Sequence, residues 1–319
     1  MINNKDKGVY MIYTLTLNPA VDYYMDMNKF DEGELNKVNN SYTLAGGKGI
    51  NVSKVLKNFG IESAALGFCG GFTGDYIKAD LNKYGIKDNF ISLTEDTRIN
   101  VKIKTAKKET EIMGKSPKIL QENIDQMLYI IDNNIQDNDI LVLSGSVPSS
   151  VKEDIYKDII QKTKSKSNVK VILDSRENAF KIAVKENVFL TKPNRKELSE
   201  YFGKDIKTVY DIITYAKKLV EDGSENVIVS LGKDGSALVN KDGSYIGNAP
   251  EGNLISSVGA GDAMVAGIVY GISQNLNILD SYKYAIASGT ATAFSEGLTT
   301  FENMNNLLDK IQIKEINLK

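Results

Sequence analysis

Short apolar runs alternate with amphipathic stretches along most of this 319-residue chain, and this alternation restricts its fold more than any other feature. Several runs are nearly continuous in Val, Ile and Leu, as in strands that are buried on both faces of a sheet. The stretches between them repeat apolar residues at helical spacing, as Val52, Val55 and Phe59 do within 50–59. The pattern predicts an α/β fold, with a mostly parallel sheet covered by helices on both faces.

The periodicity assigns each element a range. The expected strands occupy 9–17, 63–69, 139–145, 169–175, 188–192 and 225–232. The expected helices occupy 50–59, 73–84, 119–134, 150–164, 208–222, 261–274 and 279–295. The chain contains no low-complexity linker and no internal repeat, and its length suits one large core, so we expect 1–319 to form a single domain.

One segment departs from this alternation. Residues 98–113, RINVKIKTAKKETEIM, place Ile99, Val101 and Ile103 at every second position, turn near Lys107 and then resume. Period-two alternation predicts a hairpin with one solvated face. We expect 97–113 and parts of 20–45 to form a small separate sheet that acts as a lid over a ligand crevice. Two copies of the chain pairing through this lid would give a homodimer.

Composition excludes several classes of function. Lys and Arg number 39 against 41 Asp and Glu, and no basic stripe suggests a nucleic-acid partner. No apolar run approaches the ~20 residues of a membrane span, so we expect no membrane partner. The first ten residues lack the apolar core of a signal peptide, and Met11 offers an alternative start. The lone Cys69 excludes an internal disulfide and favours the cytoplasm.

The chain contains no histidine. That absence excludes Ser-His-Asp and Cys-His catalysis, as well as a histidine-ligated metal. A general base must then be Asp, Glu, Lys, Tyr or Cys. A bound metal is expected to be a hard cation with oxygen ligands.

The stretch AGGKGIN (45–51) precedes an amphipathic helix. Glycines such as Gly46 and Gly47 allow a ligand to approach the backbone, and the start of a helix favours an anion. Lys48 adds a positive charge, and Asn51 can hydrogen-bond hydroxyl groups. A tight turn with a solvated lysine explains the same residues equally well. The glycine spacing is not that of a Walker A loop.

A second glycine-rich stretch, SSVGAGDAMVAG (256–267), also opens an apolar helix. Gly259, Ala260 and Gly261 have little or no side chain, so their N–H groups can face an oxyanion. Asp262 falls in the first helical turn, where the helix dipole stabilises a carboxylate and is expected to lower its pKa. Capping alone would explain Asp262. It is also the best-placed general base beside such an anion hole.

Polar residues follow other expected strands, at the edge where open α/β sheets bind ligands. The stretches are NPAVD (18–22), SGSVPSS (144–150), LDSRE (173–177), KPNRKE (192–197) and SLGKDG (230–235). Each alone is explained by a turn, a cap or a surface ion pair. Ser144 can also donate to a phosphate or a sugar. Asn194 and Glu197 suit either a capping box or the water shell of Mg²⁺.

With these motifs the sequence resembles the ribokinase/PfkB family of carbohydrate kinases, from about Met11 to nearly the C-terminus. The resemblance rests on AGGKGINVSKVLKNFG (45–60) and SSVGAGDAMVAGIVYG (256–271), which together are far more specific than either glycine pattern alone. It implies a ribokinase-like three-layer domain with a β-sheet lid. It also implies ATP and Mg²⁺ as cofactors and a small-molecule sugar phosphate as substrate.

Other stretches narrow the resemblance within the family. They are TLTLNPAVDYYM (14–25), TRINVKI (97–103), LSGSVPS (143–149), KPNRKEL (192–198) and VIVSLGKDGSALV (227–239). They are most similar to members that phosphorylate fructose 1-phosphate at its 6-hydroxyl. Kinases of tagatose 6-phosphate or of another hexose phosphate remain an alternative, and a sugar-phosphate sensor without catalysis is an alternative of a different class.

The resemblance also implies roles for individual residues. Sugar hydroxyls would be held by Asp22, Gly46, Gly47 and Asn51, and the substrate phosphate by Lys48 and Arg98. The ATP site would be lined by Asn194, Ser230, Gly232 and Gly235, with Mg²⁺ ordered by Glu197 through water. The anion hole would be formed by Gly259, Ala260 and Gly261, with Asp262 as the catalytic base.

Two segments depart from the family pattern. Many relatives have Thr-Ser-Gly after the aspartate at position 174, whereas this chain has Ser175, Arg176 and Glu177. A contact between Arg176 and a doubly phosphorylated product is one interpretation, and a surface ion pair is the other. The segment TEIMGKSPKI (110–119) lacks the usual Asn or Glu plus Gly-Pro after the lid strand.

Overall fold

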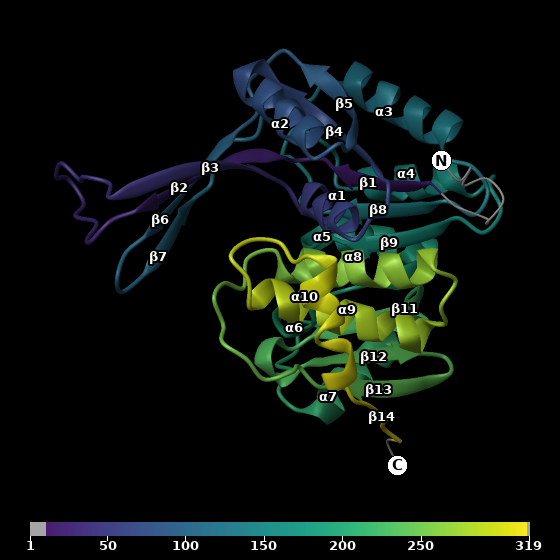
Figure 1. Cartoon of the computed structure of the whole chain (residues 1–319). Coiled ribbons are helices and arrows are strands. Elements are labelled where there is room, and N and C mark those ends of the chain that lie inside the picture. The colour runs from purple at the N-terminus through teal and green to yellow at the C-terminus, as the bar shows by residue number, and fades with distance from the viewer. Residues whose placement is uncertain (1–10, 318–319) are drawn as a thin grey trace.

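A large twisted sheet forms the centre of the computed structural model, which describes residues 11–317 (Figure 1). The strand order is β14 (Ile313–Glu315), β13 (Gly243–Gly247), β12 (Ser236–Asn240), β11 (Ser224–Ser230), β10 (Val188–Thr191), β9 (Lys170–Asp174), β8 (Ile140–Ser144), β1 (Ile12–Thr16), β4 (Ala64–Gly70) and β5 (Lys87–Leu93). In this order the neighbouring strands from β11 to β5 run parallel, whereas β12, β13 and β14 extend the sheet antiparallel.

Helices cover both faces of this sheet. Along β8, Leu141 and Leu143 pack into one apolar cluster, whereas Ile140 and Val142 pack into the other. The first cluster contains side chains of α3 (Gln121–Asn134), α4 (Ile155–Thr163), α5 (Glu177–Ala183), α6 (Arg195–Phe202) and α7 (Val209–Glu221). The opposite face is covered by α1 (Lys48–Asn58), α2 (Gly71–Lys83), α8 (Ala260–Ser273), α9 (Ile278–Ala293) and α10 (Phe301–Asn305). Burial on both sides explains the continuous apolar strands.

A second sheet projects from the edge of the body (Figure 1). Its order is β3 (Asn40–Gly46), β2 (Ala20–Asp26), β6 (Ile99–Lys104) and β7 (Glu109–Ile112). Strand β2 pairs parallel with β6 and antiparallel with β3. This small separate sheet is built from the two expected segments, 20–45 and 97–113, of which the period-two pattern marked only the second. We call it the lid, and its closing role stays a prediction.

The expected α/β fold is confirmed, and most elements lie within a few residues of their predicted ranges. Helix α4 is an exception, because it begins at Ile155 rather than at 150. Ser150 Oγ instead accepts a hydrogen bond from the Ile119 amide and donates to the Pro117 carbonyl, which holds the preceding segment as an irregular connection. The periodicity missed β5, β13, β14, α5 and α10.

Within residues 11–317, every helix is too short or too polar to cross a membrane. The expectation for residues 1–10 lies outside the described part of the chain. That the chain forms a single domain stays a prediction.

Candidate active site

The two glycine-rich stretches meet at the carboxyl edge of the large sheet. Gly47 precedes α1 with φ +149°, and Gly259 precedes α8 with φ +78°, so both turns need backbone conformations that side chains rarely adopt. Asn51 in α1 donates a hydrogen bond from Nδ2 to Asp262 Oδ2 at 2.8 Å. Asp262 lies in the first turn of α8, as expected, and is only 7% exposed.

A buried ion cluster lies beside this contact. Asp174 at the end of β9 is within 3.3 Å of Lys48 Nζ and 3.5 Å of Lys192 Nζ. Burial alone would raise the pKa of Asp174, but the two ammonium groups outweigh it and lower that pKa. Asp174 in turn raises the pKa of Lys48. Lys48 therefore remains charged near Asp262.

The expected direction of the pKa shift of Asp262 was wrong. Burial raises the pKa of Asp262 from 3.8 to about 6, and Asp174 adds to the rise, while Lys48, Asn51 and Lys192 oppose it. Desolvation of the carboxylate thus outweighs the stabilisation expected from the helix start. A carboxyl with a pKa of about 6 is still mostly ionised at pH 7, so it can accept a proton there.

Lys192 is a site residue that the sequence analysis missed. It is 5% exposed, and its Nζ would be 3.2 Å from a Cβ at position 261, so it faces the backbone of the expected anion hole directly. A side chain at Gly261 would crowd this ammonium group. The lysine stands next to the Pro-Asn pair of KPNRKE, but no sequence signal pointed it toward Gly261.

The lid contributes the carboxylate of Asp22, on β2. Asp22 Oδ1 accepts a hydrogen bond from Asn100 at 2.9 Å, and Asp22 Oδ2 lies 3.3 Å from Lys102 Nζ. A Cβ at Gly46 would come within 2.6 Å of the same carboxylate, so any side chain there would displace it. Asp22 and Gly46 therefore meet, as the shared sugar role requires. Asn100 and Lys102 were not anticipated.

Arg98 lies at the base of the lid. Its guanidinium donates to the carbonyl groups of Asn18 at 2.9 Å and Pro19 at 3.3 Å. Burial lowers the pKa of Arg98, Asp22 opposes this, and Arg176 lowers it further. The last effect indicates that the two guanidinium groups lie near enough to repel each other.

Ser144 lies deeper than expected. It aligns with Thr16 on one side and Asp174 on the other, and its side chain is completely buried. Among the described residues, its Oγ has no hydrogen-bond partner. Ser146, two residues further, accepts a hydrogen bond from Asn18. The binding role of Ser144 stays a prediction.

The expected nucleotide residues lie at the ends of β10 and β11. Asn194 and Glu197 form the capping box of α6, and Asn194 also bridges to Ser230. Gly232 and Gly235 have φ of +62° and +90°, and a Cβ on Gly235 would come within 2.1 Å of a carbonyl oxygen. The capping interpretation is thus confirmed, and it leaves the nucleotide role untested.

The part of the chain that the structure describes has no cluster of three or more carboxylate or cysteine groups placed for a metal. Mg²⁺ does not need one, because it keeps several waters and takes other oxygens from phosphates. Glu197 Oε2 accepts from the Asn194 amide at 2.8 Å, which leaves Oε1 for a water. The donor set therefore fits Mg²⁺ held through water.

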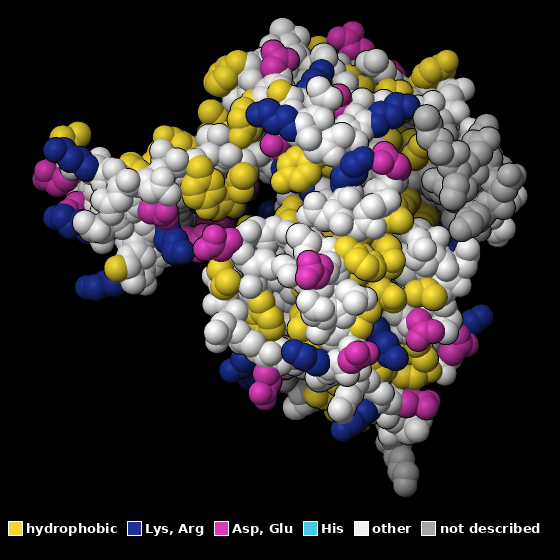
Figure 2. Space-filling model, in the orientation of Figure 1, with side chains coloured by type: hydrophobic (Ala, Val, Ile, Leu, Met, Phe, Trp, Pro, Cys, Tyr) yellow, Lys and Arg dark blue, Asp and Glu magenta, His cyan; other side chains and the backbone are white. Residues whose placement is uncertain are grey.

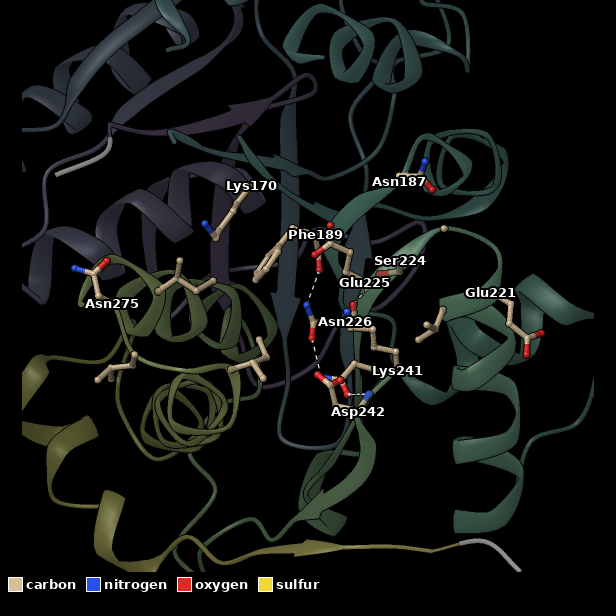
Figure 3. Close-up of a pocket in the computed structure, with 16 residues that line it drawn as sticks. Lys170, Asn187, Phe189, Glu221, Ser224, Glu225, Asn226, Lys241, Asp242 and Asn275 are labelled. Carbon is tan, nitrogen blue, oxygen red and sulfur yellow. Dashed lines mark hydrogen bonds between the residues drawn. The ribbon is translucent and has the colours of Figure 1, made fainter. Parts of the chain in front are cut away.

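A cavity of about 740 Å³ lies at the opposite edge of the sheet, where the parallel strands begin (Figure 3). Its buried amides are already occupied: Asn226 donates to the Phe189 carbonyl and accepts from Asn240. None of the expected site residues lines it. We therefore place the active site at the carboxyl edge, where the charged groups converge.

The sheet, its lid and a buried carboxylate at a glycine-rich helix start define an α/β phosphotransferase of the ribokinase-like type. The family model described as pfkB family carbohydrate kinase matches residues 15–304. The chain belongs to this family, and it is therefore an enzyme that phosphorylates a carbohydrate with ATP as donor.

Individual relatives agree. A 1-phosphofructokinase of Bacillus subtilis is 44% identical over 96% of this chain and 100% of its own length. A D-tagatose-1-phosphate kinase of Bacillus licheniformis is 31% identical over the same shares. The crystal structure of a candidate phosphofructokinase from Staphylococcus aureus superposes with a TM-score of 0.85 at 41% identity, covering 97% of this chain and 100% of that one.

Proposed function

We propose that this chain transfers the γ-phosphoryl group of ATP to the 6-hydroxyl of fructose 1-phosphate, giving fructose 1,6-bisphosphate and ADP. One observation carries the proposal: Asp262, at the start of α8, is buried beside Lys48, Lys192 and Asn51. The 44% identity with the Bacillus subtilis 1-phosphofructokinase supports the choice of substrate.

In the proposed reaction, Asp262 accepts the proton of the 6-hydroxyl. The bond from that oxygen to phosphorus forms as the bond from phosphorus to the ADP oxygen breaks. The backbone N–H groups of Gly259, Ala260 and Gly261 stabilise charge on the transferred group, and Lys192 adds a cation there. Catalysis is mainly positioning and electrostatic stabilisation.

The sugar phosphate would lie between the lid and the sheet edge. Its hydroxyl groups would bind Asp22, Asn51 and the backbone at Gly46 and Gly47. Its phosphate would bind Lys48 and Arg98, with Ser144 beneath. Two features support this placement: the carboxylate of Asp22 is fixed by Asn100, and Arg98 is held by main-chain carbonyls.

The nucleotide would lie across the ends of β10 and β11, against Asn194, Ser230, Gly232 and Gly235. Mg²⁺ would be held by Glu197 through water, and when bound it neutralises phosphate charge. The free carboxylate oxygen of Glu197 supports the assignment. The turn at Gly232 supports it too, because the space that a side chain would fill there is open.

An ADP-release assay with ATP and a panel of sugar phosphates tests the proposal. The panel contains fructose 1-phosphate, tagatose 1-phosphate, tagatose 6-phosphate, fructose 6-phosphate and free fructose. We expect kcat/KM to be highest for fructose 1-phosphate. A higher kcat/KM for another sugar phosphate would reassign the substrate, and no ADP release with any of them would favour the sensor.

Tagatose 1-phosphate is the second candidate substrate. The Bacillus licheniformis relative named for it is 31% identical to this chain. Tagatose differs from fructose only in configuration at C4. The phosphate on C1 of either sugar would therefore meet Arg98 in the same way. The ratio of kcat/KM for the two 1-phosphates decides between them.

A homodimer through the lid is the proposed assembly. Tyr42 and Leu44 are 46% and 45% exposed, and Figure 2 shows apolar side chains where the lid joins the body. Strand register places Tyr42 beside Tyr24 and Leu44 beside Asp22, so this apolar surface shares the Asp22 face. Pairing of two lids would bury it and close the sugar side of the site. We propose a cytoplasmic location, where ATP and sugar phosphates are found.

A further inference from the structure

Three neighbouring strand ends carry an aligned row of polar residues. The pairing register places Thr16, Ser144 and Asp174 side by side on β1, β8 and β9. Two positions beyond each of these come Asn18, Ser146 and Arg176. Neighbouring strands lie ~4.8 Å apart, so the row spans about 10 Å across the sheet edge.

Hydrogen bonds hold this row together. Asn18 donates to Ser146 Oγ at 3.4 Å and accepts from Ser116 at 3.0 Å. At the other end, Ser175 Oγ donates to the Gly145 carbonyl at 3.0 Å, which fixes the segment that carries Arg176 against the segment that carries Ser146. The three strand ends therefore form one hydrogen-bonded polar surface.

An arginine lies at each end of the row. Arg98 donates to the Asn18 carbonyl, while Arg176 follows the end of β9. The side chain of Arg176 is 52% exposed, and its ion pair with Glu177 is loose, at 3.9 Å. It is therefore free to turn toward an anion. Arg176 also lines a cavity of about 470 Å³ that reaches Pro193 and Glu197.

The backbone beside Arg176 is strained. Glu177 has φ +60°, a conformation that non-glycine residues other than Asn and Asp rarely adopt. Such strain persists where the surroundings impose it and is concentrated at functional sites. Glu177 directly follows Arg176 and is the first residue of α5.

We propose that Arg176 is a specificity-determining residue, which binds the phosphate of the sugar phosphate from the side opposite Arg98. The ligand class is a phosphomonoester dianion, which two guanidinium groups and the Ser146 hydroxyl suit by charge and geometry. The repulsion by which Arg176 lowers the pKa of Arg98 agrees with two guanidinium groups that lie near each other. This inference rests on the proposed function, because it assigns a further contact in the same site.

The test compares Arg176→Gln, Arg176→Lys and Lys181→Gln with the wild-type enzyme. Lys181 is the matched control, since it is an exposed cation on α5 that lines the same cavity. Binding of fructose 1-phosphate without nucleotide is measured by calorimetry, alongside KM for the sugar phosphate, KM for ATP and thermal stability.

We expect Arg176→Gln to weaken binding and to raise KM for the sugar phosphate about 10- to 100-fold, the effect of one charged hydrogen bond. KM for ATP and the rate with free fructose should not change. Arg176→Lys should recover part of the loss, and Lys181→Gln should match the wild type. Equal losses in the Arg176→Gln and Lys181→Gln variants would overturn the proposal, as would an unchanged KM in Arg176→Gln.

This comparison separates the inference from the proposed function. If the panel assay identifies a different sugar phosphate as the best substrate, the same variants are measured with that substrate. The proposed function then fails, while the Arg176 proposal stands or falls on the change in KM for whichever phosphate is used.

Discussion

The side-chain amide of Asn51 donates to Asp262 at 2.8 Å, although 211 positions separate these residues in the sequence. The contact joins the starts of α1 and α8, the two helices that follow the glycine-rich turns. It occupies Oδ2 of the Asp262 carboxylate. Asn51 thus orients the proposed base in addition to any contact with the sugar, a role that the GGKGIN motif alone did not reveal.

Replacing Asp262 by Asn should abolish most turnover while keeping substrate affinity. The amide preserves the shape and can still accept from Asn51, but it cannot take a proton. We expect kcat to fall about 10²- to 10⁴-fold, the usual contribution of a general base. Steady-state kinetics measure this loss, with both KM values within about threefold. The exposed Asp309→Asn is the matched control, and near wild-type kcat in Asp262→Asn would refute the assignment of the base.

The ionisation of Asp262 should limit activity at low pH. With a pKa of about 6 in the free enzyme, the carboxyl becomes protonated as the pH falls through 6, so kcat/KM should decrease tenfold per pH unit below that value. A pH profile of kcat/KM for the sugar phosphate checks this. A profile that stays flat down to pH 5 would contradict the raised pKa.

The same ionisation should lower the free energy of unfolding at neutral pH. Because burial raises the pKa from its ordinary value of 3.8 to about 6, the folded state binds the proton more tightly than the unfolded state. The cost of the buried charge is therefore present above about pH 6 and absent below about pH 4, and it corresponds to about 3 kcal/mol.

Asp262→Asn removes that cost, so this variant should be more stable than the wild type at pH 8, and the two should converge near pH 4. Urea denaturation at both pH values measures the difference. Equal stability at pH 8 would show that the folded protein does not penalise the carboxylate.

The sequence predicts those parts of the site that depend on neighbouring residues, and it does not predict contacts between residues far apart in the chain. The start of α8 and the position of Asp262 in its first turn follow from local glycine and apolar spacing. The pairing of Asp174 with Lys48 and Lys192 does not, because no local pattern states which carboxylate a lysine will meet. The direction of the Asp262 pKa was missed for a related reason: burial is a property of the assembled sheet and helices, whereas the helix dipole is visible in the motif.

The lid illustrates the same limit. Alternation along 98–113 predicted two strands with one solvated face. Strands β6 and β7 confirm the strands, but the solvated face was wrong, because Asn100 is 5% exposed whereas Ile99 is 39% exposed. The hydrogen bond between Asn100 and Asp22 depends on the parallel register of β6 against β2, which the period-two pattern leaves open. The polar residues that a predicted strand contacts could therefore be identified only from the structure.

Gly46→Ala should weaken sugar binding through Asp22. The new Cβ would lie 2.6 Å from Asp22 Oδ2, so the carboxylate must move, at a cost of about 1–3 kcal/mol. We expect KM for the sugar phosphate to rise about 5- to 100-fold, with KM for ATP unchanged.

A double-mutant cycle tests the cause. In an Asp22→Ala background the clash is absent, so adding Gly46→Ala should cost little more. Kinetics of the two single variants and the double variant give the interaction energy. Strictly additive losses would mean that Gly46 acts independently of Asp22.

Leu44→Lys should separate the proposed dimer. Leu44 is 45% exposed on the Asp22 face of the lid, and a lysine there would place two like charges in a paired interface. Light scattering should find a dimer for the wild type and a monomer for the variant at micromolar concentration. Leu35→Lys is the matched control, because Leu35 is 87% exposed between β2 and β3 and outside the paired strands. If the wild type is a monomer, or if Leu44→Lys has the same mass as the wild type, the lid is not the interface.

If the dimer separates, a rise in KM for the sugar phosphate would further indicate that pairing closes the sugar side of the site.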